Sequence, residues 1–464
     1  MIAMKASEIA EVVGGTLIGS DIEVSAPAFL SSKNCEPGSI FLAIKGENVD
    51  GHDFIDDAFE NGAVLALVTT SSVQRCVIVD DVTVAIGKLA NHVRRSLKSL
   101  HVIGITGSQG KTTTKELLAS ILSTRGATIS PQGNLNNELG VPITLLQCDT
   151  TTQYCVIEMG ARHKGDIAAL AAIAEPHIGV VLRVAAAHIG EFGSIENIAQ
   201  AKGELIESLG SDGVAILGQY DSFTPAMSSR HSGKVITFGE NSKSDIRATD
   251  IELREGKAHF DLVTPEGRST AALRLFGLHQ IANALAAASV AHVLGFTADQ
   301  IAGALSTSEV SARWRMEVHE LDDLVLINDA YNASPDSMAA ALTILAHLTQ
   351  ERGGESWAFL GKMRELGESS EREHQEIGTL ASKLGIDHLV AIDSPEYGEA
   401  LVPDSLMAVH SSSSKEEALE IARFISRGDV VLCKASRSER LEVLAADIEK
   451  MWEIKIKAEE ESSR

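Results

Sequence analysis

The chain has 464 residues, and its formal net charge of −24 argues against a general nucleic-acid or anionic-membrane binder, because both need a basic surface. Its N-terminus lacks the long apolar core of a signal peptide, and no apolar run is long and uninterrupted enough to span a bilayer. Five scattered cysteines without a CxxC pair fit reduced thiols rather than a zinc site, so we expect a cytoplasmic protein that is not embedded in a membrane.

Residues 1–82 are predicted to form a small α/β domain, since a chain of this length favours about three domains. One helix is expected at residues 54–61, and short apolar runs predict strands at residues 40–44, 64–68 and 77–79. The polar, glycine-containing segment at residues 37–54 could offer backbone donors to a ligand. From its composition, a plain turn between a strand and a helix is the simpler interpretation.

The segment VIGITGSQGKTTT at residues 102–114 combines a buried strand, a glycine-punctuated loop and the first turn of a helix. The N–H groups of such a loop form a concave positive site for phosphate oxygens together with the helix N-terminus. Lys111 is placed to reach the terminal phosphates, and Thr112 to offer a hydroxyl to Mg²⁺. The glycine spacing is a variant of the strict phosphate-loop pattern, so a glycine-rich turn is the alternative. The nucleotide-binding residues predicted here are Thr106, Gly107, Ser108, Gln109, Gly110, Lys111, Thr112 and Thr113.

Residues 83–310 are predicted to form the central domain. A helix at residues 84–99 leads into the first strand, and the strands are predicted at residues 102–105, 154–158, 178–182 and 214–217. The alternation of strands and helices indicates a mainly parallel sheet that is covered on both faces. Ligands of such sheets gather at the carboxyl ends of the strands, so polar residues at these ends are candidate site residues.

Several polar residues follow these strands. Glu158 ends one strand, where its carboxylate could hold magnesium or cap the next helix. His188 and Lys202 follow the next strand, although a lone histidine is usually packed and a lone helical lysine is usually solvated. The asparagines of GNLNNELGVP, residues 133–142, could line a substrate channel or only form a loop. Asn283 lies one turn into an alanine-rich helix.

Residues 311–464 are predicted to form a third, Rossmann-like α/β domain. Its strands are predicted at residues 324–327, 357–360, 388–392 and 430–433. It has no second phosphate loop, so we expect it to supply a substrate or to close over the nucleotide. The segments NDAYNASPDSM, GKMRELGE and CKASRSERLE stand at the ends of its strands.

The motifs TGSQGKTT, NLNNELGVP, EMGARHKGDI, AHIGEFGS, AKGE, GLHQIAN, DAYNASPDSM and KASRS stand in the order expected of Mur ligases, and the chain resembles that family over nearly its whole length. DAYNASPDSM and EMGA favour the members that join D-Ala-D-Ala to UDP-muramoyl-tripeptide. The resemblance implies an N-terminal UDP-substrate domain, a central ATP-binding domain and a C-terminal domain that closes on ATP and binds the amine. It further implies a monomeric ATP-dependent peptide ligase that acts through an acyl phosphate in peptidoglycan precursor synthesis.

The resemblance also implies roles for individual residues. Lys202 occupies the position of a lysine that carries CO₂ as a carbamate, and Asn283 that of a residue contacting adenine. Arg315 and Asp329 match residues that meet the phosphates and the ribose. The catalytic residues implied are Lys111, His188 and Lys202. The ligands implied for Mg²⁺, with two ions expected, are Thr112, Glu158, His188 and Lys202. The substrate-binding residues implied are Ser32, Asn137, Asn332, Lys434 and Ser436.

Some positions depart from the family pattern. Ser31-Ser32-Lys33 replaces Asp-Ser-Arg, Leu182-Arg183 replaces Thr-Asn, and the single departures are Gln280, Lys362 and Ala435. A divergent ligase that acts on another nucleotide-linked substrate or amine is therefore a second hypothesis. A nucleotide-dependent scaffold without activity is a third, but the joint presence of the implied catalytic and metal-binding residues argues against it.

Overall fold

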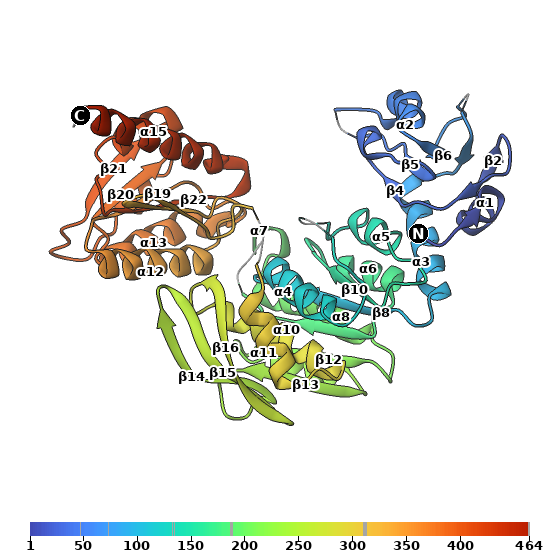
Figure 1. Cartoon of the computed structure of the whole chain (residues 1–464), viewed down its shortest axis with the longest axis horizontal. Helices are drawn as coiled ribbons and strands as arrows, with labels where there is room; N and C mark the ends of the chain where they lie inside the picture. The colour runs from blue at the N-terminus through green and yellow to red at the C-terminus, as the bar shows by residue number, and fades with distance from the viewer. Residues whose placement is uncertain are drawn as a thin grey trace.

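The computed structural model describes residues 1–46, 48–72, 74–131, 133, 135–185, 189–309 and 313–462. The chain folds into three α/β lobes, each built on one main β-sheet (Figure 1). The predicted fold class is thereby confirmed. The boundaries at residues 82/83 and 310/311 stay predictions, although the three sheets fall within the three predicted ranges.

The N-terminal lobe contains a five-stranded sheet in the order β2-β7-β6-β5-β4. The strands are β2 (Thr16–Ile18), β4 (Ala28–Phe29), β5 (Ser39–Leu42), β6 (Ala63–Val68) and β7 (Cys76–Ile78), with β1 (Met4–Lys5) paired to β3 (Glu23–Val24) beside them. The helices are α1 (Ala6–Val13) and α2 (Ile55–Glu60). The three predicted strands and the predicted helix are confirmed as β5, β6, β7 and α2.

The central lobe contains a nine-stranded sheet in the order β16-β15-β14-β13-β12-β11-β8-β10-β9. Its strands are β8 (His101–Thr106), β9 (Thr128–Ile129), β10 (Tyr154–Glu158), β11 (Ile178–Val181), β12 (Val214–Gly218), β13 (Lys234–Gly239), β14 (Ile246–Arg254), β15 (Lys257–Thr264) and β16 (Gly267–Phe276). The pairs from β9 to β14 are parallel, as predicted, whereas β14, β15 and β16 form an antiparallel extension that the sequence analysis missed.

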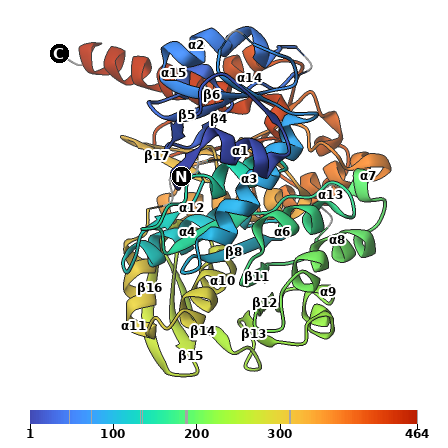
Figure 2. The same ribbon diagram turned by 90° about the vertical axis from the view of Figure 1, so that its right-hand side faces the viewer.

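Helices cover both faces of the parallel part of this sheet. They are α3 (Val82–Ser96), α4 (Lys111–Ser123), α5 (Gly140–Leu145), α6 (Asp166–Ala174), α7 (Ile189–Phe192), α8 (Ile195–Glu207), α9 (Phe223–Ala226), α10 (Gln280–Val293) and α11 (Ala298–Thr307). Figure 2 shows α4, α10 and α11 on one side of the strands and α6 and α8 on the other. Because both faces are covered, β8 and β10 are apolar on both, with Val102 in one core cluster and Ile103 in the other.

The order of the strands determines where a ligand can bind. Strand β8 lies between β10 on one side and β11 on the other side. The chain leaves β8 towards β9 on one side, and after β10 it crosses back past β8 to β11 on the other side. The direction of the connections thus reverses beside β8, which opens a crevice at the carboxyl end of the sheet. The loop before α4 lies at this crevice.

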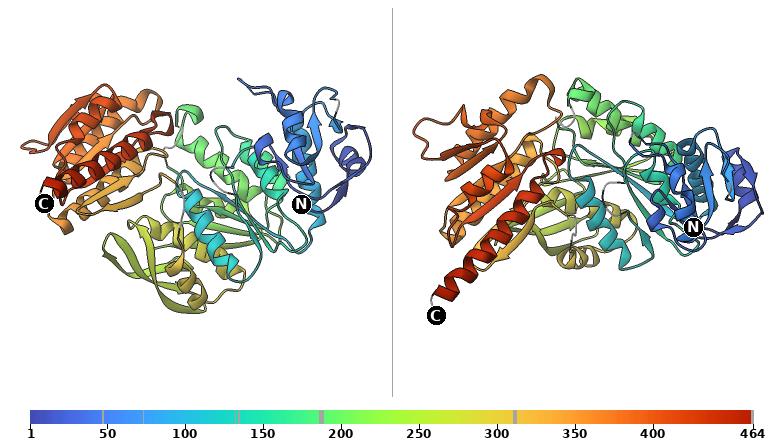
Figure 3. Two further views of the ribbon diagram at one scale, coloured as in Figure 1. Left: turned by 45° about the horizontal axis from the view of Figure 1, so that its top comes forward. Right: turned by 90° about the horizontal axis from the view of Figure 1, so that it is seen from above.

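The C-terminal lobe contains a six-stranded sheet in the order β17-β18-β22-β19-β20-β21. Its strands are β17 (Glu317–Leu321), β18 (Leu324–Asn328), β19 (Ser356–Leu360), β20 (His388–Ile392), β21 (Ala408–Ser412) and β22 (Val430–Lys434). Only β17, which was not predicted, pairs antiparallel among these described strands. The helices are α12 (Pro335–Arg352), α13 (Ser370–Lys383), α14 (Lys415–Ala422) and α15 (Leu441–Ser462), and α15 extends away from the lobe at its end (Figure 3).

The lobes are attached to one another in different ways. One continuous apolar cluster joins α1 and the N-terminal sheet to α3, α5 and α6 of the central lobe. The two core clusters of the C-terminal lobe stay almost entirely within that lobe. Apolar burial therefore holds the N-terminal lobe on the central lobe, and polar contacts reach the C-terminal lobe. In the part of the chain that the structure describes, no helix has the length and apolar character needed to cross a membrane.

Candidate active site

The loop between β8 and α4 is held by hydrogen bonds from its own side chains. The hydroxyl of Thr106 donates to Met159 O at 2.9 Å, and that of Ser108 donates to Ala185 O at 2.9 Å. The Lys111 ammonium group donates to Gly107 O at 2.9 Å. These bonds fix the shape of the loop, whose backbone N–H groups can then form a concave site for an anion.

Gly110 is needed for two independent reasons. It precedes α4 with φ of 82°, a left-handed conformation that glycine adopts at low cost. A Cβ atom at this position would lie 2.1 Å from Asn283 Oδ1, so α4 and α10 approach each other closely here. Asn283 in turn accepts a hydrogen bond from the Thr114 hydroxyl at 3.4 Å and donates to Gln280 Oε1 at 2.8 Å.

Glu158 lies at the end of β10, next to the first turn of α4. One carboxylate oxygen accepts a hydrogen bond from the Thr112 hydroxyl at 2.8 Å, and the other accepts from Asn136 Nδ2 at 2.8 Å. The side chain is buried, so its negative charge faces the loop and not solvent. The structure thus brings together Thr112 and Glu158. Asn136 was not singled out, whereas its predicted neighbour Asn137 accepts from Gly140 N at 3.0 Å at the start of α5.

Three lysines gather at this site: the charge of Glu158 acts on Lys111 and Lys115, and the charge of Lys111 acts on Lys202. Burial, together with repulsion from the Lys111 cation, lowers the pKa of Lys202 on α8 from 10.5 to about 7. Burial also lowers the pKa of Lys111, although attraction to Glu158 acts in the opposite direction. Lys115, which the sequence analysis overlooked, is fully buried and donates to Pro131 O at 2.5 Å and to Gly133 O at 3.0 Å. Burial thus lowers the pKa of all three lysines at this site.

The C-terminal lobe contributes a buried ion pair. Lys434 at the end of β22 is 1% exposed, and its ammonium group lies 2.6 Å from Asp329 Oδ2 and 2.8 Å from Asn332 O. The other oxygen of Asp329 accepts from Met316 N at 3.0 Å. Burial lowers the pKa of His279, in the loop before α10, to about 4, with Asp329 and Lys434 among the charges that act on it. The ends of the two lobes therefore meet here.

The other predicted residues have the following positions. Arg315 stacks on the ring of Tyr331 at 3.8 Å, and its charge acts on Lys111 and Lys115. The hydroxyl of Ser436 accepts from Arg364 N at 2.8 Å, which joins the loops after β22 and β19. Ser32 lies in the N-terminal lobe, in a short 3-10 helix at Ser32–Asn34, and is 8% exposed. His188 lies outside the described residues. Among the residues that are described, no group of three His, Cys, Asp or Glu side chains is arranged to hold a metal ion.

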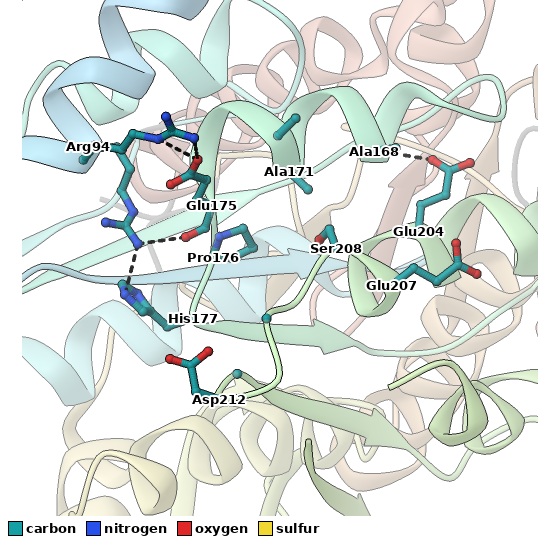
Figure 4. A pocket seen from close by; sticks show the side chains of 14 residues that line it. Arg94, Ala168, Ala171, Glu175, Pro176, His177, Glu204, Glu207, Ser208 and Asp212 are labelled. Atoms are coloured by element: carbon teal, nitrogen blue, oxygen red, sulfur yellow. Dashed lines mark hydrogen bonds and ion pairs between the residues drawn. The ribbon is translucent and has the colours of Figure 1, made fainter. Parts of the chain in front are cut away.

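A cavity of about 800 Å³ lies at the opposite end of the central sheet, before β11 and β12 (Figure 4). Its arginine and glutamate side chains are engaged with the protein itself. Arg94 donates to Ala174 O at 3.1 Å and to Glu175 O at 2.9 Å, and it lies 3.0 Å from His177 Nε2. Arg95 pairs with Glu175 at 2.5 Å. These contacts tie α3 to the sheet, so we assign no ligand to this cavity.

Three protein-family models match the sequence, and all three describe domains of Mur ligases. The Mur ligase family catalytic domain matches residues 29–96, the Mur ligase middle domain matches residues 105–291, and the Mur ligase glutamate ligase domain matches residues 314–437. The chain belongs to the Mur ligase family.

Two relatives of high similarity carry the same name. UDP-N-acetylmuramoyl-tripeptide–D-alanyl-D-alanine ligase of Mycobacterium tuberculosis (strain H37Rv) is 37% identical over 96% of this chain and 97% of its own. The ligase of that name from Escherichia coli (strain K12) is 36% identical over 95% of this chain and 97% of its own. The resemblance that the motifs indicated is thereby confirmed.

Solved structures agree with this result. MurF from Acinetobacter baumannii matches with a TM-score of 0.87 and 33% identity, over 97% of this chain and 99% of that one. MurF ligase from Thermotoga maritima, in complex with ADP, matches with a TM-score of 0.80 and 30% identity, over 93% of this chain and 99% of that one.

Proposed function

We propose that this chain is an ATP-dependent ligase that joins D-Ala-D-Ala to UDP-N-acetylmuramoyl-tripeptide and releases ADP and phosphate. The observation that carries the proposal is the combination of full-length similarity to ligases of that name with a preformed loop that presents Lys111 beside the Thr112–Glu158 pair. We also propose that it acts in the cytoplasm as a monomer.

The reaction needs activation of a carboxylate. A carboxylate does not react with an amine at neutral pH, so one of its oxygens first attacks the γ-phosphorus of ATP, and ADP leaves. The amine of the dipeptide then attacks the carbonyl carbon of the acyl phosphate, loses a proton and expels phosphate. Phosphoryl transfer of this kind depends on positioning and on neutralising charge. Lys111 and the loop N–H groups supply both functions at the terminal phosphates.

The residues around Glu158 fit a magnesium ion. A buried carboxylate and a hydroxyl 2.8 Å apart are the oxygen donors that Mg²⁺ prefers, and the ion would neutralise charge on the phosphates. Thr112 and Glu158 would hold it, with His188 proposed as a further ligand and a second ion proposed at Lys202. What the chain itself contributes is a carboxylate oriented by Asn136 and Thr112 and shielded from solvent.

Lys202 has the properties of a lysine that reacts with CO₂. With a pKa of about 7, much of its amine is uncharged at neutral pH, and only the uncharged amine can attack CO₂. The product, a carbamate, releases one proton and is negative, so it also removes the repulsion from Lys111. We propose that Lys202 is carbamylated. A carbamate resonance in the ¹³C NMR spectrum under ¹³CO₂ that disappears in Lys202→Met supports this, and an unchanged spectrum contradicts it.

The remaining predicted residues are proposed to bind the substrates. Asn283 would meet adenine at the α4–α10 contact, while Arg315 and Asp329 would meet the phosphates and ribose from the C-terminal lobe. On the substrate side we propose Ser32 for the uridine nucleotide. For the tripeptide and dipeptide we propose Asn137, Asn332, Lys434 and Ser436. Closure of the C-terminal lobe would complete the site and exclude water.

Phosphate release with defined substrates tests the proposal. We expect release only when ATP, UDP-N-acetylmuramoyl-tripeptide and D-Ala-D-Ala are all present. Release that does not depend on the dipeptide contradicts a ligase. Release that depends on another amino acid or peptide supports the divergent ligase that the departures at Ser31-Ser32-Lys33 and Lys362 left open.

A further inference from the structure

Two side chains of the central lobe converge on one carboxylate of the C-terminal lobe. Gln109 Nε2, in the phosphate loop, lies 3.4 Å from Asp336 Oδ2 and 3.0 Å from Ser334 Oγ. Arg183, which follows β11, places a terminal nitrogen 3.5 Å from the same oxygen of Asp336. Asp336 lies in the first turn of α12. These three residues, Gln109, Arg183 and Asp336, are called the lobe bridge below.

The central side of the lobe bridge is fixed to the phosphate loop. Arg183 O accepts a hydrogen bond from Ser108 N at 2.9 Å, and Leu182 N donates to Thr106 O at 3.0 Å. The backbone of Arg183 is therefore tied to the loop that carries Gln109. A force that pulls on Asp336 acts directly on the residues that are proposed to hold the phosphates.

Arg183 is not fully satisfied in this arrangement. Its Nε atom is buried and has no hydrogen-bond partner within the described residues, and its contact with Asp336 is longer than an ordinary hydrogen bond. A buried donor without a hydrogen-bond partner destabilises the conformation that contains it, so a conformation in which the donor is bonded is favoured. A slightly closer approach of the C-terminal lobe would shorten the Arg183–Asp336 contact.

The arginine is also a departure from the family pattern, where asparagine is usual at this position. An asparagine side chain carries no charge and is shorter, so it could not pair with a carboxylate across the lobes in the same way.

We propose that Arg183 and Gln109, acting through Asp336, are positioning residues that hold the C-terminal lobe over the phosphate loop. The inference rests on the proposed function, because the groups brought into place are Arg315 and Asp329 at the nucleotide. A second contact between the lobes, from Gly190 N to Glu365 O at 3.2 Å, is independent of the lobe bridge. Removing the lobe bridge therefore changes the balance between open and closed lobes and leaves each lobe folded.

A charge exchange tests the inference. Arg183 and Asp336 are partly exposed, so their pairing contributes modestly, and Arg183→Asn is expected to lower kcat/KM for ATP about two- to five-fold. Arg183→Asp is expected to lower it more, since two carboxylates then face each other. Combining Arg183→Asp with Asp336→Arg is expected to restore most of the loss. A double variant as poor as the worse single variant overturns the inference.

Salt and lobe closure give readouts that a merely structural role would not move. Increasing ionic strength is expected to lower kcat/KM of the wild type more than that of Arg183→Asn, because salt screens the pair. Small-angle scattering is expected to show compaction of the wild type on ADP binding that is smaller in Arg183→Asp and restored in the exchanged pair. The matched control is Arg254→Asn, whose arginine pairs with Glu252 on its own strand, and no effect is expected there.

These readouts separate the two proposals. If the wild type releases no phosphate with the dipeptide, the proposed function fails, while compaction on ADP still tests the lobe bridge. If Arg183→Asp does not fold, Asp336→Asn breaks the same pair by removing the charge of the partner carboxylate at constant size. Its loss is expected to equal that of Arg183→Asn, with no further loss when the two are combined. Additive losses in that double variant overturn the inference.

Discussion

Lys111 is held at the phosphate loop by the backbone of that loop. Its ammonium group donates to Gly107 O, while Glu158 is engaged by Thr112 and Asn136. The cation is therefore available to incoming phosphates without first breaking an ion pair.

Replacing Lys111 by alanine removes this charge from the terminal phosphates. We expect kcat to fall by at least about 100-fold, as for loss of a preorganised electrostatic contact, with no loss of folded structure. Acceptor-dependent phosphate release and circular dichroism measure the two effects. Lys98→Ala, on an exposed lysine, is the control. A Lys111→Ala variant with normal turnover would remove this residue from the mechanism.

Lys202 links the site to stability. Its pKa is lower in the folded chain than in the unfolded chain, so between about pH 7 and 10.5 the unfolded state binds a proton that the folded state lacks. The free energy of unfolding therefore rises with pH across this window. Below about pH 7, the buried ammonium group of Lys202 lowers the free energy of unfolding by up to roughly 5 kcal/mol.

Lys202→Met keeps the length of the side chain and removes the charge. We expect this variant to be more stable than the wild type near pH 7, and its stability to rise less steeply above pH 7. Urea unfolding at several pH values measures both, with Lys164→Met on an exposed lysine as the control. In CO₂-free buffer, where Lys202 stays an amine, parallel pH dependences of the wild type and Lys202→Met would contradict the lowered pKa.

At the scale of elements, the start of α4 depends on Gly110. Gly110→Ala is expected to lose about 1–2 kcal/mol from the left-handed backbone and more from the clash with Asn283. Gly165→Ala is the matched control, because Gly165 has φ of 95° and open space around it. Thermal unfolding and ADP titration measure the difference. Equal losses in the two variants would show that the α4–α10 contact is unimportant.

The elements that carry the site could be predicted because each leaves a local signal. Apolar runs that end in Thr106 or Glu158 identify strand ends, and the glycines before Lys111 identify the loop. The antiparallel strands β14 to β16 were missed although β15 alternates, with Ala258, Phe260 and Leu262 buried on one face. This period of two was available in the sequence and was not recognised.

Other features leave no local signal. Gln109 and Ser334 are 225 positions apart, and only the packing of two lobes brings them together. The choice between Asn136 and Asn137 likewise depends on which amide faces Glu158 once α5 has formed. The sequence therefore identified the asparagine-rich segment at residues 133–142 but not Asn136 as the residue that contacts Glu158.

At the scale of the whole molecule, the two outer lobes differ in how they are held. The N-terminal lobe shares an apolar core with the central lobe, whereas the C-terminal lobe is joined to it by polar contacts and by the packing of Phe276 against its core. Polar interfaces of this kind open at lower cost than a shared core. We therefore expect the C-terminal lobe to move when nucleotide binds.

Hydrogen exchange locates that motion. ADP is expected to slow exchange around Gly190 and in residues 361–367, where the lobes touch, and to leave β5, β6 and β7 unchanged. Exchange that slows equally in the N-terminal sheet would contradict closure by the C-terminal lobe alone. Binding of UDP alone serves as the control, because it is expected to protect the N-terminal lobe instead.

The acyl phosphate is the central claim, and the fate of one oxygen atom tests it most directly. The terminal carboxylate of UDP-N-acetylmuramoyl-tripeptide is labelled with ¹⁸O and turned over with ATP and D-Ala-D-Ala. Because the carboxylate oxygen that attacks phosphorus leaves with it, we predict one ¹⁸O atom in each phosphate released per amide formed. Mass spectrometry of the phosphate measures this, and unlabelled phosphate accompanied by amide formation would contradict the account.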